Sequence, residues 1–491
     1  MTPSLDYATS ARTGVTRARF VVVGFIITLA LVTYLDRACM GTLAPNFQKD
    51  FHLDDNQMSL VFSAFAIAYA AFEVPTALWA QRRGTRRVLT RIVLWWSFLT
   101  FATAAALTPE IIAHLFPSTG PTDAQAAAAT AAAATSTQAA PAILSSSAWM
   151  ISFVLLLSVR FLFGMGEAGA WPCAAASYAK WIPASERGIA QGLLFAGAHL
   201  GGFFTPILVV VMRDSWGVPW RYILVIFGSV GLIWASAWYY WFRDDPSQHK
   251  RVGEAELRKI VEGRRVQAHE HGGWRYVKKL FLNRNVIPLC LMYVGNAYAY
   301  YFCITWLPKF LTEKHHFEKT QLGIATGLPF GLAVVSDVFG GITTDFMTRR
   351  YGPRVGRSIL GAVCYGTAAI CTVFAALATN PWVAIICLAV AVAAVMFTLG
   401  AAWASVIEIS GNHTAMVGAL MNTAGNTAAI FSAPVAIYAR DHWGGWNAPL
   451  YVIAGLFVLG TVSWLFVDPR KSIFDEAMET QTNGFPVEPR T

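Results

Sequence analysis

The chain has 491 residues, of which 55% are hydrophobic and 13% are charged, whereas soluble domains carry about 25% charged residues. This composition, with a mean hydropathy of +0.47, excludes a water-soluble globular protein and indicates a polytopic membrane protein. The net charge of +9 is explained by basic segments between the apolar runs, so it does not indicate a nucleic-acid partner.

Apolar runs of about 20 residues, each long enough to cross a bilayer as a helix, recur along the whole chain. We predict twelve spans, near 18–45, 58–80, 88–107, 148–178, 188–212, 221–242, 286–310, 322–344, 358–378, 382–406, 415–438 and 449–467. The expected fold is an all-α membrane protein with two six-helix halves, 20–242 and 285–467. Residues 1–19 and 468–491 are the predicted terminal tails.

Basic residues precede the first span and follow even-numbered ones, as in RRGTRR at 82–87 and RRYGPR at 349–354. Because lysine and arginine accumulate on the cytoplasmic side of a membrane, both termini are predicted to be cytoplasmic. The first apolar run lacks a small-residue cleavage site. It is therefore expected to be a retained span rather than a signal peptide.

A strongly charged segment at 243–284 separates the halves and is the predicted cytoplasmic linker. Its EAELRKIVEGRR portion has the pattern of a short amphipathic helix, either on the membrane surface or in water. Residues 117–147 form a low-complexity tract of Ala, Thr, Ser and Pro. We expect this tract to be an external insertion without a binding role.

The seven cysteines stand singly in apolar runs, without CxxC or Cys/His spacing. No disulfide framework, metal site or cofactor is therefore expected. No GxSxG, HExxH or Walker A pattern occurs, so an enzyme is not expected either.

Charged residues inside two of the predicted spans are the main functional signal. TYLDRACMG in the first span contains Asp36 and Arg37, and VRFLFGMGEAGAWP in the fourth contains Arg160 and Glu167. Helical spacing places the last two on one face with about 10 Å of rise between them. Such charges cost several kcal/mol unless they meet a partner or water. These four residues either form a structural ion-pair network or line a water-filled cavity that binds protons and an anion.

Several motifs resemble the anion:cation symporter family of the major facilitator superfamily, namely YLDR, RRGTRRVL, RFLFGMGEAGAWP, WIPASERGIAQG and GALMNTAGNTAAIFSAP. That family includes bacterial hexuronate, galactonate and glucarate transporters, and animal sialin and vesicular glutamate carriers. The resemblance covers nearly all the spans. It implies a monomeric, proton-coupled importer of organic anions, mainly sugar acids, in the lipid of a bacterial inner membrane. The proton gradient would be its driving force.

The resemblance also implies roles for individual residues. Arg37 would grip the substrate carboxylate, Asp36 and Glu167 would carry protons, and Arg160 would pair with these carboxylates. Asn422 and Asn426 would bind substrate hydroxyls or hydrogen-bond between helices. Apart from the resemblance, Tyr293 and Asn296 in the seventh span are weaker candidates for a substrate-binding wall, since tyrosines of a span are often only interface anchors. The full predicted substrate-binding set is Arg37, Tyr34, Asn422, Asn426, Tyr293, Asn296 and His199, and the gating set is Arg82, Asp345 and Arg349.

The sequence also departs from the family pattern. Gln81 replaces an acidic residue in the first-half turn, and Ala198 and His199 replace a glutamine and an aromatic residue. Glu73 and Asp337 are further intramembrane carboxylates, for which we favour structural roles. Two alternatives stay open: an exporter or exchanger of another carboxylate or aromatic acid, and a non-transporting nutrient sensor.

Overall fold

The computed structural model describes residues 16–115, 146–261, 278, 280–317 and 319–473. All regular elements in these ranges are helices. The predicted insertion at 117–147 lies almost entirely outside the described residues, as do large parts of the predicted tails and the middle of the linker.

The first half contains the long helices of its predicted spans. They are α1 (Ala18–Thr42), α3 (Asp55–Arg83), α4 (Thr85–Ala104), α7 (Ser146–Glu167) with α8 (Ala170–Trp181), α9 (Arg187–Val210) and α10 (Trp220–Trp241). Short helices α2 (Ala44–Phe51) and α5 (Pro109–Leu115) follow α1 and α4. The α7–α8 break falls at Gly169, whose φ of 89° is a left-handed conformation that glycine adopts without strain.

The second half has a similar set. It comprises α13 (Val286–Thr305), α15 (Lys319–Tyr351), α16 (Leu360–Leu377), α17 (Pro381–Met396) with α18 (Leu399–Ser410), α19 (Thr414–His442) and α20 (Asn447–Phe466). The short α14 (Leu307–His315) follows α13. Each half therefore contains one span built from two consecutive helices, α7–α8 and α17–α18.

Most of the predicted spans are long and apolar enough to cross a bilayer. Ten helical segments in the described ranges meet this condition, and α4 with α5, bent by 77°, forms an eleventh if counted together. The span expected at 415–438 corresponds to α19, a 29-residue helix outside that set. Its asparagines and threonines lower its hydropathy, and two of the asparagines, Asn422 and Asn426, line the site described below.

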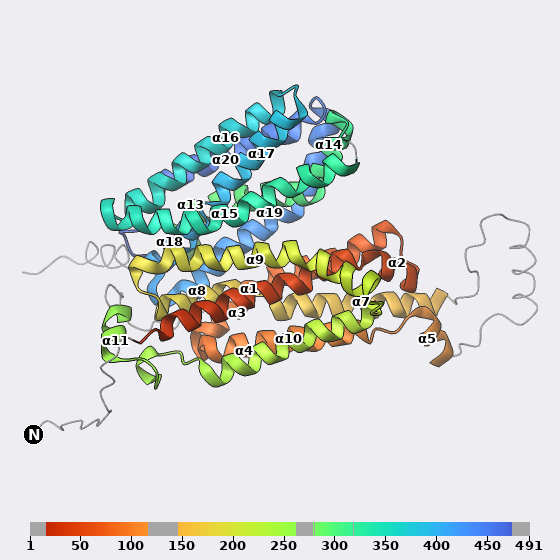
Figure 1. Ribbon diagram of the computed structural model, residues 1–491, viewed down its shortest axis with the longest axis horizontal. Coiled ribbons are helices and arrows are strands. Elements are labelled where there is room, and N and C mark those ends of the chain that lie inside the picture. The colour runs from red at the N-terminus through yellow and green to blue at the C-terminus, as the bar shows by residue number, and fades with distance from the viewer. Residues whose placement is uncertain (1–15, 116–145, 262–277, 279, 318, 474–491) are drawn as a thin grey trace, which may run out of the picture.

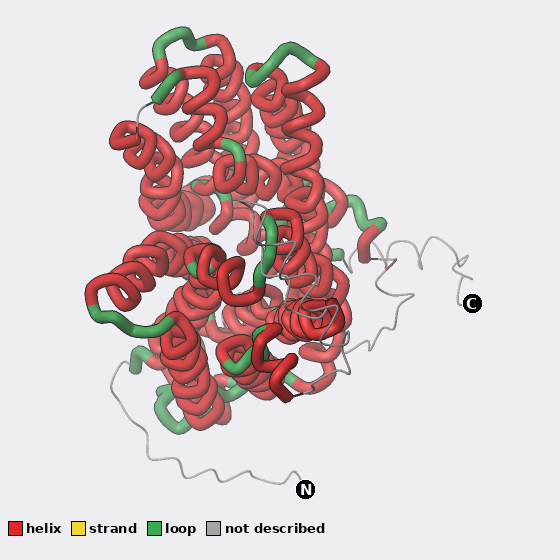
Figure 2. The backbone as a smooth tube through the Cα atoms, turned by 90° about the vertical axis from the view of Figure 1, so that its right-hand side faces the viewer, coloured by secondary structure: helices red, strands yellow, loops and turns green. Residues whose placement is uncertain are grey.

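The two halves are separate helical bundles that meet along a shared face. Figure 1 shows them one above the other, with α8, α9 and α18 between them, and Figure 2 shows the same pair from the side. Across this face α9 packs against α15 and α18, while α19 packs against α3 and α8. We call the end that carries α11 (Glu254–Val261), the start of α9 and the last turns of α15 the linker side.

The amphipathic segment of the linker is docked on the first half. The carboxylate of Glu256 on α11 accepts hydrogen bonds from the backbone N–H groups of Ala18 and Arg19, both at 3.0 Å. An acidic group is favoured there because the first N–H groups of a helix have no intrahelical acceptor. Lys259 on the same helix donates to Glu186, just before α9, at 2.6 Å. The linker helix therefore ties the beginnings of α1 and α9 together.

Small residues allow the halves to approach closely on the linker side. A Cβ at Gly192 of α9 would lie 2.2 Å from the carbonyl oxygen of Asp337 on α15. A Cβ at Gly341 or Gly400 would lie 2.7 Å from the carbonyl oxygen of Gly188. This is the small-residue packing expected where membrane helices touch at their backbones.

We expect Gly192→Ala to destabilise the purified protein by about 1–3 kcal/mol, because the new methyl group forces α9 and α15 apart. The measurement is the thermal unfolding midpoint in detergent, which should fall. Gly24→Ala is the matched control, since no atom lies within 4 Å of its Cβ position on α1. An equal midpoint for both variants would contradict the close packing of these helices.

Candidate functional site

A narrow cavity lies at the centre of the molecule, between the two halves, and its volume is about 70 Å³. All seven predicted substrate-binding residues line it, namely Tyr34, Arg37, His199, Tyr293, Asn296, Asn422 and Asn426. Further aromatic side chains complete the wall, among them Tyr69, Trp171, Phe195, Tyr300 and Tyr301. The structure therefore brings residues that are far apart in the sequence to one polar and aromatic cavity.

Arg37 is the cation of this cavity. Its Nε donates to Oε1 of Glu167 at 2.7 Å, and the Glu167 side chain is 1% exposed. The guanidinium also lies over three aromatic rings, at 4.7 Å from Tyr69, 5.2 Å from Phe65 and 5.7 Å from Tyr34. These contacts fix the plane of the guanidinium and keep its charge within the apolar interior.

Arg160 does not pair with a carboxylate, contrary to the interpretation from sequence. No acidic oxygen of the described residues lies within ion-pair distance of it; its guanidinium instead lies 4.7 Å from the Phe163 ring and 5.3 Å from the Phe65 ring. The reason is that Glu167, two helical turns away, turns toward Arg37 on α1. Arg160 still interacts electrostatically with Asp36.

Asp36 points away from the cavity, although it adjoins Arg37. Successive residues of a helix differ by about 100° in direction, so the two side chains cannot share a face. Both carboxylate oxygens of Asp36 are buried and have no hydrogen-bond partner among the described residues. Its nearest charged neighbours are Glu167 and Arg160. A carboxylate in this setting is costly when ionised.

Glu73 of α3 is held by α19 of the other half. It accepts hydrogen bonds from Asn422 at 2.5 Å, Thr423 at 3.2 Å and Asn426 at 3.5 Å. Of the two roles considered for the asparagines, interhelical bonding is therefore present, and both still line the cavity. Sequence reasoning placed Glu73 and the asparagines separately and missed this cluster.

A second contact between the halves joins His199 of α9 to Asp337 of α15. The distance between Nδ1 and Oδ2 is 2.5 Å, and the two side chains are 6% and 0% exposed. Sequence reasoning placed His199 in the substrate site and gave Asp337 a structural role, without connecting them. No spacing could have shown this pair, because it depends on how the halves dock.

The linker-side contact is centred on Asp345, as predicted. Its carboxylate accepts from the N–H groups of Gly188 at 2.9 Å and Ile189 at 2.8 Å, at the start of α9. Its cationic partner is Arg357 at 3.0 Å, which also binds Glu408 at 3.0 Å. Arg357 is fully buried, so these ion pairs are shielded from water.

The other two predicted gating residues have different positions. Arg349 bonds back to the carbonyl of Asp345 in its own helix at 3.3 Å, and Arg82 is exposed at the end of α3. Gln81, beside Arg82, contacts Nδ1 of His413 in the other half at 3.1 Å. Gln81 and Arg357, which sequence reasoning did not include in the gating set, take part in the linker-side contacts.

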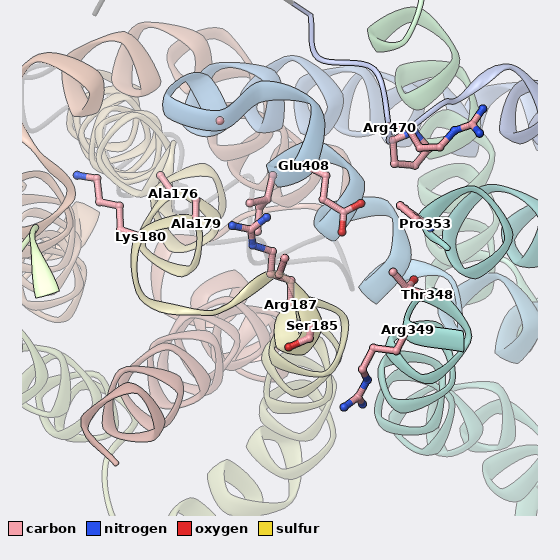
Figure 3. A pocket seen from close by; sticks show the side chains of 14 residues that line it. Ala176, Ala179, Lys180, Ser185, Arg187, Thr348, Arg349, Pro353, Glu408 and Arg470 are labelled. Carbon is pink, nitrogen blue, oxygen red and sulfur yellow. The ribbon is translucent and has the colours of Figure 1, made fainter. Parts of the chain in front are cut away.

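A larger cavity, about 380 Å³ in volume, lies on the linker side. Its lining includes the basic residues Lys180, Arg187, Arg349 and Arg470, together with Glu408. Figure 3 shows Lys180, Arg349 and Arg470 extending in different directions rather than toward one point. Hydrogen bonds from Arg470 also hold the pKa of Asp468 below its usual value. This cavity has volume but no convergent anion site, so the central cavity is the candidate substrate site.

Among the described residues, no group of three or more His, Cys, Asp or Glu side chains is placed to hold a metal ion. Arg37 and His199 are the basic groups that line the central cavity. Three carboxylates outside its lining contact residues of its wall: Glu167 contacts Arg37, Glu73 contacts Asn422 and Asn426, and Asp337 contacts His199. This arrangement can bind an anion and protons at one place between the halves.

Comparison with characterised proteins gives consistent results. Residues 26–433 match the model of the Major Facilitator Superfamily. The probable sulfoacetate transporter SauU of Cupriavidus necator is 28% identical over 460 residues, which cover 92% of this chain and 94% of that protein. The probable galactarate/D-glucarate transporter GudP of Bacillus subtilis is 25% identical, with 93% and 94% covered. The hexuronate transporter of Bacillus subtilis is 24% identical, with 91% and 94% covered.

Solved structures support the same fold. The proton:xylose symporter XylE, bound to a bromodeoxyglucose, superposes with a TM-score of 0.68 at 14% identity, covering 94% of this chain and 98% of XylE. The Escherichia coli fucose:proton symporter FucP gives a TM-score of 0.64 at 15% identity, covering 92% and 100%. The family match shows that the chain belongs to the Major Facilitator Superfamily, and its apolar helices agree with a multi-pass membrane transporter.

Proposed function

We propose that the protein is a proton-coupled symporter that imports small organic anions, most notably sugar acids, across a bacterial inner membrane. The observation that carries this proposal is Arg37, a cation on the wall of the central cavity between the halves. Relatives named for sulfoacetate, galactarate, D-glucarate and hexuronate all carry small organic anions, which supports the same class here. The transporter needs no cofactor beyond the proton gradient and works as a monomer in the lipid bilayer.

The orientation follows from charge. The linker side carries the basic segments, so we place it, with both termini, in the cytoplasm. The hydrogen bonds between the halves, at Gln81, Asp345, His199 and Glu73, lie on this side or at the level of the central cavity. The structure then corresponds to a carrier closed toward the cytoplasm, and substrate enters from outside.

The Arg37–Glu167 ion pair suggests how the proton and the anion are coupled. A guanidinium engaged by Glu167 at 2.7 Å is partly neutralised and binds an incoming carboxylate weakly. A proton on Glu167 removes this competition, and the anion takes the place of its carboxylate. Loss of the proton to the cytoplasm returns Glu167 to Arg37 and expels the anion. Asp36, buried without a hydrogen-bond partner, is the second proton carrier.

Counterflow tests this function directly. Purified protein in liposomes preloaded with unlabelled D-glucarate should take up labelled D-glucarate, and sulfoacetate or hexuronate should compete. A sensor or an enzyme would give no exchange. An exporter or exchanger would give counterflow but no accumulation when the outside is made acidic. Folded protein that exchanges none of these anions would overturn the proposal.

A further inference from the structure

The pair formed by His199 and Asp337 is a buried ionisable unit that the coupling of Arg37 and Glu167 leaves unused. His199 lies on α9 in the first half, and Asp337 lies on α15 in the second. Their 2.5 Å contact is therefore present only while the halves meet at this level. His199 also lines the central cavity, whereas Asp337 lies behind it.

The protonation state of His199 decides whether its Nε2 atom can donate a hydrogen bond to a substrate. Nδ1 is directed at Oδ2 of Asp337, so the hydrogen bond to the carboxylate uses the Nδ1 proton. Within the described residues, Nε2 has no hydrogen-bond partner. A neutral imidazole then presents a lone pair at Nε2, which repels an anionic oxygen. A protonated imidazole presents an N–H donor, which binds it.

The other groups around His199 do not supply a counter-ion. Tyr300 of α13 packs against the imidazole ring at 5.5 Å, and Tyr34 and Arg37 of α1 line the same cavity. Helices α8 and α18 also pack on α9, but their charged residues, Lys180 and Glu408, line the linker-side cavity instead. The remaining titratable groups of the cavity wall are tyrosines, namely Tyr69, Tyr293 and Tyr301. Asp337 is thus the carboxylate that balances an imidazolium here.

We propose that His199, with Asp337 as its counter-ion, is a second site where a proton and the transported anion bind together, Nε2 donating to an anionic oxygen of the substrate. Asp337 acts through the histidine and is a positioning residue. Because it belongs to the other half, rearrangement of the halves that opens the linker side weakens its contact with the imidazole. The proton and the anion then leave together. This inference rests on the proposed function and adds to it a second binding group on the wall that Arg37 also lines.

Such a site also bears on substrate class. With Arg37 at one position of the wall and protonated His199 at another, the cavity suits an anion with negatively charged oxygens at both ends. We therefore expect a dianion such as D-glucarate to lose more affinity than a monoanion such as D-galacturonate when His199 is replaced.

The test measures the apparent affinity for labelled D-glucarate in counterflow at pH 6 and pH 8. For the wild type, affinity is expected to be higher at pH 6 than at pH 8, because only a protonated imidazole donates a hydrogen bond from Nε2. His199→Gln should lower the affinity at pH 6 by roughly tenfold, with little change at pH 8, because one charge-assisted hydrogen bond is lost. Asp337→Asn keeps an acceptor for Nδ1 but removes the charge that balances an imidazolium, so it should also weaken binding at pH 6.

His442→Gln is the matched control, because His442 is exposed and stacks on Tyr438 away from the cavity. A purely structural pair would lower affinity equally at both pH values, and this outcome, or an unchanged pH profile in His199→Gln, would overturn the inference. Repeating the measurement with Glu167→Gln present removes the pH dependence that comes from the Arg37–Glu167 pair. Absence of exchange by the wild type would instead defeat the proposed function.

Discussion

Replacing Arg37 with lysine is expected to raise the KM for the transported anion by roughly 10- to 100-fold, although the charge is kept. Hydrogen bonds to charged groups contribute about 1.5–3 kcal/mol, and each 1.4 kcal/mol is a factor of about ten in affinity. The guanidinium can hold Glu167 through Nε and still offer other N–H groups to an anion. An ammonium group has no planar fork and cannot keep both geometries.

The measurement is counterflow KM for D-glucarate in proteoliposomes, with the amount of inserted protein determined for each variant. Arg213→Lys is a suitable control, since Arg213 is bound to Asp214 at 2.6 Å on the surface, outside the central cavity. If Arg37→Lys transports every tested anion with wild-type KM, Arg37 is not the carboxylate clamp.

The location of the site could be predicted from sequence because burying charge in a membrane is costly. Asp36, Arg37 and Glu167 stand out against apolar surroundings, and that contrast needs no knowledge of the fold. Helical spacing placed Glu167 on one face with Arg160, but it could not show that the partner of Glu167 is Arg37. Spacing constrains neighbours on one helix, whereas the Arg37–Glu167 pair joins two helices 130 residues apart in sequence.

The contacts between halves were beyond sequence reasoning for the same reason. Glu73 and Asn422 are separated by 349 residues, and His199 and Asp337 by 138. Their pairing is fixed by how α3 meets α19 and how α9 meets α15. Each residue is a plausible structural group by itself, and only the docked bundles show that both carboxylates contact side chains of the opposite half.

At the linker-side contact, sequence reasoning identified one residue of the ion pair but not the other. The turn motif predicted gating roles for Asp345 and Arg349 without assigning a partner to either, and the structure pairs Asp345 with Arg357. Arg357 lies in a π-helical turn, Arg354–Ile359, which begins the next span and directs its side chain back to Asp345. A sequence with several arginines in one turn does not reveal which of them returns to the carboxylate, because that depends on the local helix geometry.

Replacing Glu167 with glutamine is expected to abolish uptake driven by a pH gradient while leaving anion exchange intact. The amide imitates the protonated acid: it keeps the shape of the side chain and an oxygen that accepts from Nε of Arg37, but it cannot release a proton. Arg37 is then permanently available to the anion, so binding and exchange persist. Accumulation against a gradient should fall to the level seen without a pH difference.

Paired assays on one preparation separate these steps, with counterflow at equal pH and uptake with the outside acidic. Glu313→Gln is the control, because Glu313 is an exposed carboxylate near the end of α14 that binds Trp446 at 2.8 Å. Asp36→Asn should show a related loss of coupling. The Asp36 carboxylate is buried without a hydrogen-bond partner among the described residues and is the proposed second proton carrier, whereas an amide cannot bind and release a proton. Concentrative uptake by Glu167→Gln at the wild-type level would remove Glu167 from the proton path. The Arg37–Glu167 contact would then be a structural ion pair, and the coupling role would pass to Asp36 and to the His199–Asp337 pair.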